Sequence, residues 1–88
     1  MKVTLRKFLD IVGTNFIETY IACLYVYEWD ELFEKWFPKQ LLQGFKSIEE
    51  LEPYMDYEIV SFRQWLNYGQ VDQQDIYVRE IEELFWKQ

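Results

Sequence analysis

Carboxylates are the most numerous side chains in this sequence that could do chemistry. The 88 residues include 16 Asp and Glu against 9 Lys and Arg, so the formal net charge is 9 − 16 = −7. The chain has no histidine and one cysteine, Cys23. Without histidine, the usual general base of serine and cysteine hydrolases is missing, and so is every zinc site that uses His. We therefore expect no enzymatic activity, no catalytic residues and no cofactor.

Other uses of carboxylates are also disfavoured. Neighbouring pairs such as Asp30 and Glu31 offer oxygen ligands, but the sequence lacks the Asp-x-Asp-x-Asp-Gly loop of calcium sites. Two carboxylates can hydrolyse a glycoside, but a chain this short offers no deep cleft for a sugar polymer. The three glycines do not have the spacing of a phosphate-binding or dinucleotide-binding loop. We expect no metal site.

The acidic residues fall into three groups along the chain, within residues 28–34, 49–58 and 72–83. A folded surface with such rows of carboxylates can imitate a phosphate backbone and occupy a basic groove of a partner protein. The alternative is a solvated surface that keeps the protein in solution. The acidic balance argues against direct binding of nucleic acid and of an anionic membrane. The acidic candidates for partner binding are Glu28, Asp30, Glu31, Glu34, Glu49, Glu50, Glu52, Asp56, Asp72 and Asp75.

Aromatic side chains are in excess. The sequence has 4 Trp, 7 Tyr and 7 Phe, more rings than a core of this size comfortably hides. Trp and Tyr are favoured anchors of protein interfaces. The alternative is a second layer of core or the seam of a homodimer. The aromatic candidates for partner binding are Trp29, Trp36, Trp65 and Tyr68.

Local patterns predict the elements that position these residues. Apolar spacing of three and four predicts a helix over residues 4–12. Aromatic and β-branched residues predict a strand over 16–29, apolar on both faces from 20 to 27. Residues 32–37 favour a strand returning as a hairpin, because Pro38 leaves little room for the alternative helix. Residues 39–45 are expected to form a loop.

The second half of the chain is expected to have the same order of elements, a helix followed by two strands. Ser47 and Glu50 have capping-box spacing and predict a short helix over 48–55. A strand is expected over 57–65, a turn at 67–69 and a last strand over 75–80. A helix over 73–86 is the alternative for the C-terminal part. The fold class predicted is therefore α+β: a single domain over 1–88 in the order αββαββ, with an antiparallel sheet and two short helices on one face.

The order of motifs resembles that of short uncharacterised accessory proteins of phages and mobile elements in low-GC Gram-positive bacteria. The start Thr4-Leu5-Arg6-Lys7-Phe8-Leu9 resembles their "T-L-x-x-F-L" opening, and residues 57–62 and 75–78 resemble their later strands. The aromatic middle of this chain, residues 25–37, departs from that pattern. The resemblance implies an accessory protein of a mobile element. Small acidic proteins of that origin include anti-CRISPR and anti-restriction inhibitors.

Together these features predict a non-enzymatic protein-binding module. We expect it to occupy a basic, nucleic-acid-binding surface on a host defence nuclease such as a CRISPR effector. The alternative is a structural protein that self-associates through an aromatic surface. The single cysteine favours a reducing compartment, and no apolar run is long enough to span a bilayer. The resemblance to phage and mobile-element proteins implies the bacterial cytoplasm.

Overall fold

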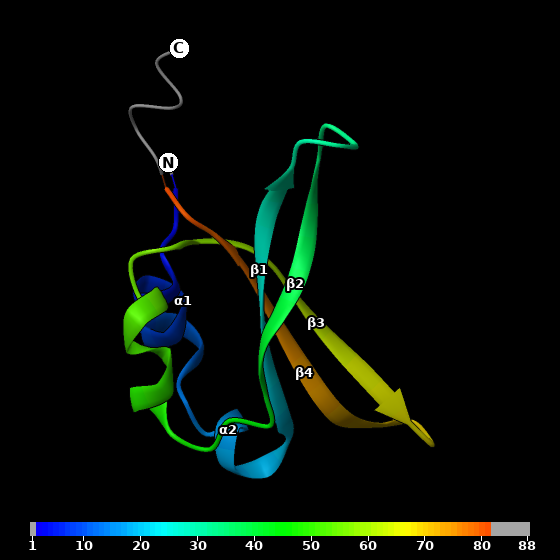
Figure 1. Ribbon diagram of the computed structural model, residues 1–88. Coiled ribbons are helices and arrows are strands. Elements are labelled where there is room, and N and C mark those ends of the chain that lie inside the picture. Colours follow the sequence, from blue (N-terminus) through cyan, green and yellow to red (C-terminus); the bar gives the residue numbers. More distant parts are fainter. Residues whose placement is uncertain (1, 82–88) are drawn as a thin grey trace.

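The N-terminal helix forms where the apolar spacing predicts it. The computed structural model describes residues 2–81, with residues 18 and 19 described by their backbone alone, and places helix α1 at Leu5–Val12 (Figure 1). The hydroxyl of Thr4 caps α1 by accepting the backbone N–H of Lys7 at 3.2 Å. Gly13 ends the helix with φ 81°, a conformation that favours glycine.

The predicted first strand begins later than its composition indicates. Residues Phe16–Thr19 form a single helical turn, α2, and strand β1 spans Ile21–Asp30. The prediction of a strand from residue 16 was therefore wrong for residues 16–19, which form this helical turn. Aromatic and β-branched residues are common in strands because they fit a half-buried surface, and a short helix can present such a surface too. In α2, Ile17 is buried in the core.

Strand β2 confirms the predicted hairpin and corrects the predicted loop. β2 spans Lys35–Gln43 and pairs antiparallel with β1. The strand predicted over 32–37 was therefore right from residue 35 and wrong for residues 32–34, which belong to the turn, and the helical alternative was wrong. The loop predicted over 39–45 was wrong up to Gln43. β2 lies at an edge of the sheet, and most of its residues are exposed. Because β2 is an exposed edge strand, it lacks the apolar alternation that identifies strands in a sequence. An edge strand also tolerates a proline, here Pro38.

The capping box forms, but the helix behind it is of the tighter 3₁₀ type. Helix η1 spans Ile48–Tyr54, and Pro53 lies inside it. The Ser47 hydroxyl accepts the N–H of Glu49 at 3.2 Å, and a carboxylate oxygen of Glu50 accepts the N–H of Ser47 at 3.3 Å. Leu51 is the buried residue that ties η1 to the core.

The last two strands form a second hairpin. β3 spans Glu58–Asn67, β4 spans Gln70–Arg79, and the turn lies at Tyr68 and Gly69 as predicted. Both strands are longer than their apolar patterns indicate, because their outer ends are exposed. The alternative helix over 73–86 was wrong for the part within β4. Its remainder after residue 81 lies outside the described residues.

The two hairpins lie side by side in one mixed sheet of order β2-β1-β4-β3 (Figure 1). β1 and β4 are the central pair and run parallel, from Ile21 opposite Gln73 to Tyr27 opposite Arg79. One mixed sheet with helices on one face agrees with an α+β class. The predicted order αββαββ was wrong, because α2 precedes β1 and the second helix is the 3₁₀ helix η1, and the prediction of a wholly antiparallel sheet was wrong as well. Each hairpin is antiparallel within itself, and no local pattern shows how two hairpins meet.

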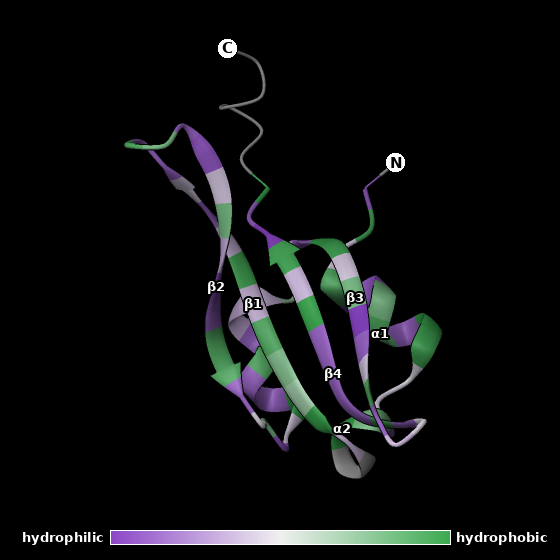
Figure 2. Ribbon diagram, turned by 90° about the vertical axis from the view of Figure 1, so that its right-hand side faces the viewer, coloured by the Kyte–Doolittle hydropathy of each residue, from purple (hydrophilic) through white to green (hydrophobic). Residues whose placement is uncertain are grey.

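The helices cover one face of this sheet, and the core lies between the two layers (Figure 2). Even-numbered residues of β1, such as Leu24 and Val26, face the helices together with Ile76 and Val78 of β4. Leu5 and Leu9 of α1 and Leu51 of η1 complete the core. Among the described residues, no helix or strand covers the opposite face. In the same part of the chain no helix is long and apolar enough to cross a membrane.

Candidate functional site

The β1–β2 hairpin extends beyond the four-stranded sheet. Tyr27 opposite Arg79 is the last pair between β1 and β4. The pairs Glu28–Phe37, Trp29–Trp36 and Asp30–Lys35 follow, and among the described residues these strand segments pair only with each other. Figure 1 shows this end projecting from the body of the molecule. We call residues 28–37 the hairpin tip.

The turn of the hairpin tip has a defined geometry. A side-chain oxygen of Asp30, Oδ1, accepts the backbone N–H of Leu32 at 2.9 Å and that of Phe33 at 3.1 Å. Glu34 closes the turn with φ 51°, in the left-handed region. Such Asp-to-backbone bonds fix a turn locally. The apolar side chains of the turn are therefore held at the end of an ordered hairpin.

Two aromatic pairs line the hairpin tip. The rings of Trp29 and Trp36 meet edge to face with centroids 5.6 Å apart, and those of Phe33 and Phe37 do so at 6.0 Å. Because Trp36 and Phe37 are successive strand residues, the two pairs lie on opposite faces of the ribbon. Leu32 at the turn is 84 % exposed and Phe33 is 62 % exposed. The tip thus presents a large apolar surface to solvent.

The first predicted acidic group surrounds this apolar surface. Glu28, Asp30, Glu31 and Glu34 all belong to residues 28–37, where Lys35 is the single basic residue, so the tip carries −4 + 1 = −3. The structure therefore brings these four acidic candidates together with the aromatic candidates Trp29 and Trp36. The sequence reasoning missed Leu32, Phe33 and Phe37. A turn that projects beyond the sheet has no core to bury such residues, and that projection was not visible in the sequence.

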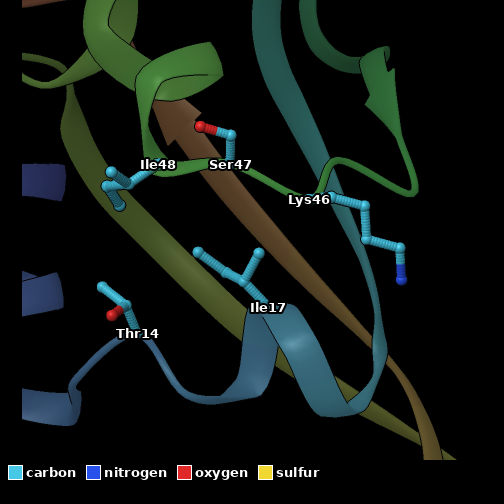
Figure 3. A pocket seen from close by; sticks show the side chains of 5 residues that line it. All are labelled: Thr14, Ile17, Lys46, Ser47 and Ile48. Carbon is cyan, nitrogen blue, oxygen red and sulfur yellow. The ribbon is translucent and has the colours of Figure 1, made fainter.

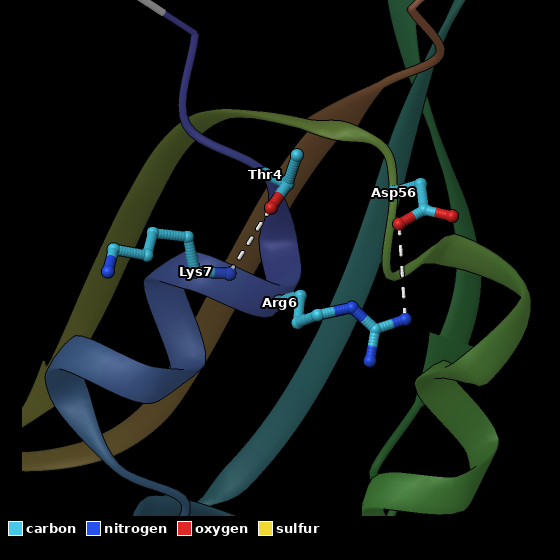
Figure 4. A network of polar contacts seen from close by, with 4 residues as sticks. All are labelled: Thr4, Arg6, Lys7 and Asp56. Atoms are coloured by element: carbon cyan, nitrogen blue, oxygen red, sulfur yellow. Dashed lines mark hydrogen bonds and ion pairs between the residues drawn. The ribbon is translucent and has the colours of Figure 1, made fainter.

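The second acidic group lies on a different part of the molecule, on and after η1. A carboxylate oxygen of Glu50 accepts the N–H groups of Lys46 and Ser47 and so belongs to the capping box. Asp56 lies 3.9 Å from the Arg6 guanidinium, in a largely exposed ion pair (Figure 4). Such pairs contribute little stability. Glu49 and Glu52 are exposed. This group is on the helix layer, separate from the hairpin tip (Figure 1).

The two candidates of the third acidic group differ in exposure. Asp72 is exposed, but Asp75 is only 1 % exposed, which counts against Asp75 as a partner-binding residue. The Asp75 carboxylate accepts the indole N–H of Trp65 at 2.5 Å and the side-chain amide N–H of Gln73 at 2.8 Å. Trp65 is half exposed around this bond. The spacing of acidic residues along the sequence does not show which of their carboxylates becomes buried in the sheet.

The uncovered sheet face is filled by side chains that contact one another. Tyr25 of β1 and Tyr77 of β4 stack with centroids 4.7 Å apart, and the Arg63 guanidinium lies over Tyr77 at 5.4 Å. The Arg79 guanidinium bonds a Glu58 carboxylate oxygen at 2.6 Å. Burial, followed by the nearby Asp75 carboxylate, raises the pKa of both tyrosines. These tyrosines are neutral at pH 7. The contacting side chains on this face have a structural role.

A small pocket lies between α2 and the start of η1 (Figure 3). It is lined by Thr14, Ile17, Lys46, Ser47 and Ile48, and its volume is about 250 Å³. That is below the usual range for small-molecule sites. The Ser47 hydroxyl caps η1, and the Lys46 side chain, the one acid or base among these lining residues, points away from Ser47 (Figure 3). Within residues 2–81 the structure also contains no group of three or more metal-binding side chains.

Comparisons with known proteins place no further constraint on the site. A scan against protein-family models and searches of curated proteins and of solved structures find no match.

Proposed function

We propose that this chain is a non-enzymatic protein-binding module and that the hairpin tip is its docking element. One observation carries the proposal: residues 28–37 hold exposed apolar side chains and four carboxylates together at the end of an ordered, projecting hairpin. An exposed apolar patch with a polar rim is typical of an interaction site. The acidic rim selects a partner whose apolar depression is surrounded by Lys and Arg.

The two kinds of side chain have different tasks in this proposal. Leu32 and Phe33 enter the apolar depression, lose their contact with water and supply most of the affinity. The carboxylates of Glu31 and Glu34 attract the basic rim over a distance and raise the association rate. Binding should therefore weaken with salt without being abolished, because the apolar contacts are not screened.

The partner class that we propose is a nuclease of a bacterial defence system. Grooves that bind nucleic acid combine basic residues with apolar and aromatic surfaces, which is the complement of the hairpin tip. The resemblance to phage and mobile-element accessory proteins supports the same class. In this proposal the chain acts in the bacterial cytoplasm as an anti-CRISPR-like or anti-restriction inhibitor and blocks the site where nucleic acid loads.

A binding screen with matched variants tests this proposal. Purified CRISPR and restriction nucleases would be immobilised, and association of the wild-type chain would be measured at 50 and 500 mM salt. The double variant Glu31→Lys/Glu34→Lys should reduce the association rate at low salt at least tenfold, by inverting the charge of the tip. The control Glu49→Lys/Glu52→Lys makes the same charge change on η1 and should have a smaller effect.

Two results would contradict the proposal. Equal losses from the tip and η1 variants would assign binding to net charge alone. A complex that nucleic acid fails to displace would mean that the chain does not occupy the loading site of the nuclease.

A second candidate function, self-association, is supported by a separate group of exposed apolar side chains. That group lies on β3, at the other side of the sheet from β2.

A further inference from the structure

The two edges of the sheet differ in how they are protected. β2 and β3 are the edge strands. β2 carries Pro38 at its centre and Lys35 and Lys39 on either side, and proline and lysine are the residues that discourage pairing at an edge. β3 contains no proline and no lysine. Its outer edge therefore lacks the proline and the lysines that discourage pairing at the other edge.

The N-terminal segment covers only the start of β3. Thr4 forms an isolated antiparallel bridge with Glu58, and the N–H of Ile59 donates to the carbonyl of Val3 at 2.7 Å. Irregular pairing with β4 occurs between Ile59 and Ser61 and again after Trp65. Residues 61–65 between these points form a regular stretch. Within residues 2–81 no strand pairs with their outer side, so their outward backbone groups can pair with another strand.

Exposed apolar side chains gather along this unprotected edge. Val60, Trp65 and Leu66 are 46 %, 51 % and 66 % exposed, and Tyr68 in the turn is 99 % exposed. Residues 59–68 contain no Asp or Glu, in a chain with 16 of them. Two copies could therefore bring these edges together without facing carboxylates across the contact.

We propose that the free edge of β3 is the interface between two copies of this chain, paired antiparallel about a two-fold axis at Gln64. A two-fold axis normal to the sheet keeps both helix layers on the same side and forms one eight-stranded sheet. In this register each Gln64 lies opposite the other, and Arg63 lies opposite Trp65 of the second copy. The neighbouring register about Arg63 places two guanidiniums opposite each other and is disfavoured.

The chemistry of the edge favours a second copy over a foreign strand. Arg63 already places its guanidinium over an aromatic ring, that of Tyr77, at 5.4 Å within the chain. Trp65 of the second copy offers the same kind of contact, which a foreign strand would have to reproduce. The two-fold axis relates two such contacts between Arg63 and Trp65, and the backbone hydrogen bonds of residues 61–65 add to them.

Cysteine cross-linking tests the register directly. Residues opposite each other across an antiparallel pair have Cα atoms about 4.5–5.5 Å apart, which suits a disulfide. Gln64→Cys should give a covalent dimer under mild oxidation. Gln40→Cys, at an exposed position on the β2 edge, is the matched control and should give no covalent dimer. The native Cys23 is buried and does not compete.

Native mass spectrometry and light scattering from 1 to 200 µM supply the second measurement. The wild-type chain should shift from monomer to dimer in this range. Val60→Lys, with its fold checked by circular dichroism, should raise the dissociation constant at least tenfold, and Leu41→Lys on the β2 edge should change it less than twofold. A wild-type chain that stays monomeric at 200 µM without a Gln64→Cys cross-link would overturn the proposal.

The same experiment separates this inference from the docking function of the hairpin tip. Leu32→Ser/Phe33→Ser should leave the dimer intact, because the tip does not belong to the β3 edge. Loss of the dimer in that variant would place self-association at the tip and would overturn the β3 interface.

Discussion

Asp75 shows how burial changes the role of a charged residue. The carboxylate lies on the uncovered face of the sheet, yet it is buried under Trp65 and bonds the side chains of Trp65 and Gln73. Both bonds come from N–H donors, so the group fits only as an acceptor. Asp75 therefore organises the outer face of β3 and β4 from a buried position.

The Asp75→Asn variant tests this role. An amide of the same shape turns one acceptor into a donor that faces another N–H group, so the free energy of unfolding should fall by about 1–3 kcal/mol. Urea unfolding followed by tryptophan fluorescence measures the change. Asp72→Asn, at the exposed position of the same strand, should stay within about 0.5 kcal/mol of the wild type. Equal stability of the two variants would mean that the Asp75 bonds contribute nothing.

Tyr68 occupies a position in the β3–β4 turn that does not suit its side chain. Tyr68 and Gly69 have φ of 52° and 79°, the positive values of a two-residue hairpin turn in which asparagine and glycine are favoured. Its ring is almost fully exposed. Tyr68→Asn should therefore raise the free energy of unfolding by about 1 kcal/mol, measured by urea unfolding. A loss of stability would show that the tyrosine ring packs against the hairpin in solution.

Buried tyrosines predict a stability change at alkaline pH. Burial is the main cause of the raised pKa of Tyr25, Tyr57 and Tyr77. The unfolded chain releases these phenolic protons near pH 10, before the folded chain does, so stability is full below pH 10 and falls above it. Urea unfolding between pH 8 and 11.5 measures this fall. Tyr77→Phe should make it smaller, and an unchanged slope in that variant would exclude Tyr77 as a source.

At the scale of elements, the hairpin tip is stabilised by its own local contacts. Asp30→Ala removes the acceptor of two turn hydrogen bonds, and the hairpin tip has no neighbouring strand to compensate. Amide exchange should accelerate about fivefold to tenfold at residues 31–35 and stay unchanged in β4, because about 1 kcal/mol is lost locally. Glu31→Ala removes the same charge from the same turn and is the control. Equal acceleration in β4 would show that the tip is part of the cooperative core.

The predictability of each element follows from how local its determinants are. The cap at Thr4, the capping box at Ser47 and the turn at residues 68–69 depend on neighbours in the sequence, and all three were predicted. The strand β2 was cut short because an exposed edge strand lacks an apolar pattern. The helical turn at Phe16–Thr19 was missed because its composition also suits a strand.

The candidate site was predictable in part for the same reason. The acidic and aromatic residues of the hairpin tip are neighbours in the sequence, so their association could be predicted. The burial of Asp75 depends on the pairing of β4 with both β1 and β3. The pairing of β4 with β1 joins residues such as Cys23 and Asp75, which are 75 − 23 = 52 positions apart, and a local pattern does not encode it.

At the scale of the whole molecule, the mixed sheet separates two apolar surfaces. The parallel pairing of β1 with β4 ends at Tyr27, so the β1–β2 hairpin is left to project at one end of the sheet. The same strand order leaves β3 at an edge, away from β2. The acidic tip and the acid-free edge of β3 can therefore bind different surfaces at the same time. We expect a dimer that presents two hairpin tips.

The affinity of the tip for the proposed nuclease partner tests the central claim most directly. We would titrate the nuclease identified in the binding screen with the wild-type chain and with Leu32→Ser/Phe33→Ser by calorimetry. Both substituted side chains are exposed, so the melting temperature should stay within about 2 °C of the wild type. The account predicts an affinity loss of about 100-fold, which corresponds to about 2.8 kcal/mol for two buried anchors. An affinity within twofold of the wild type, with the fold intact, would contradict it.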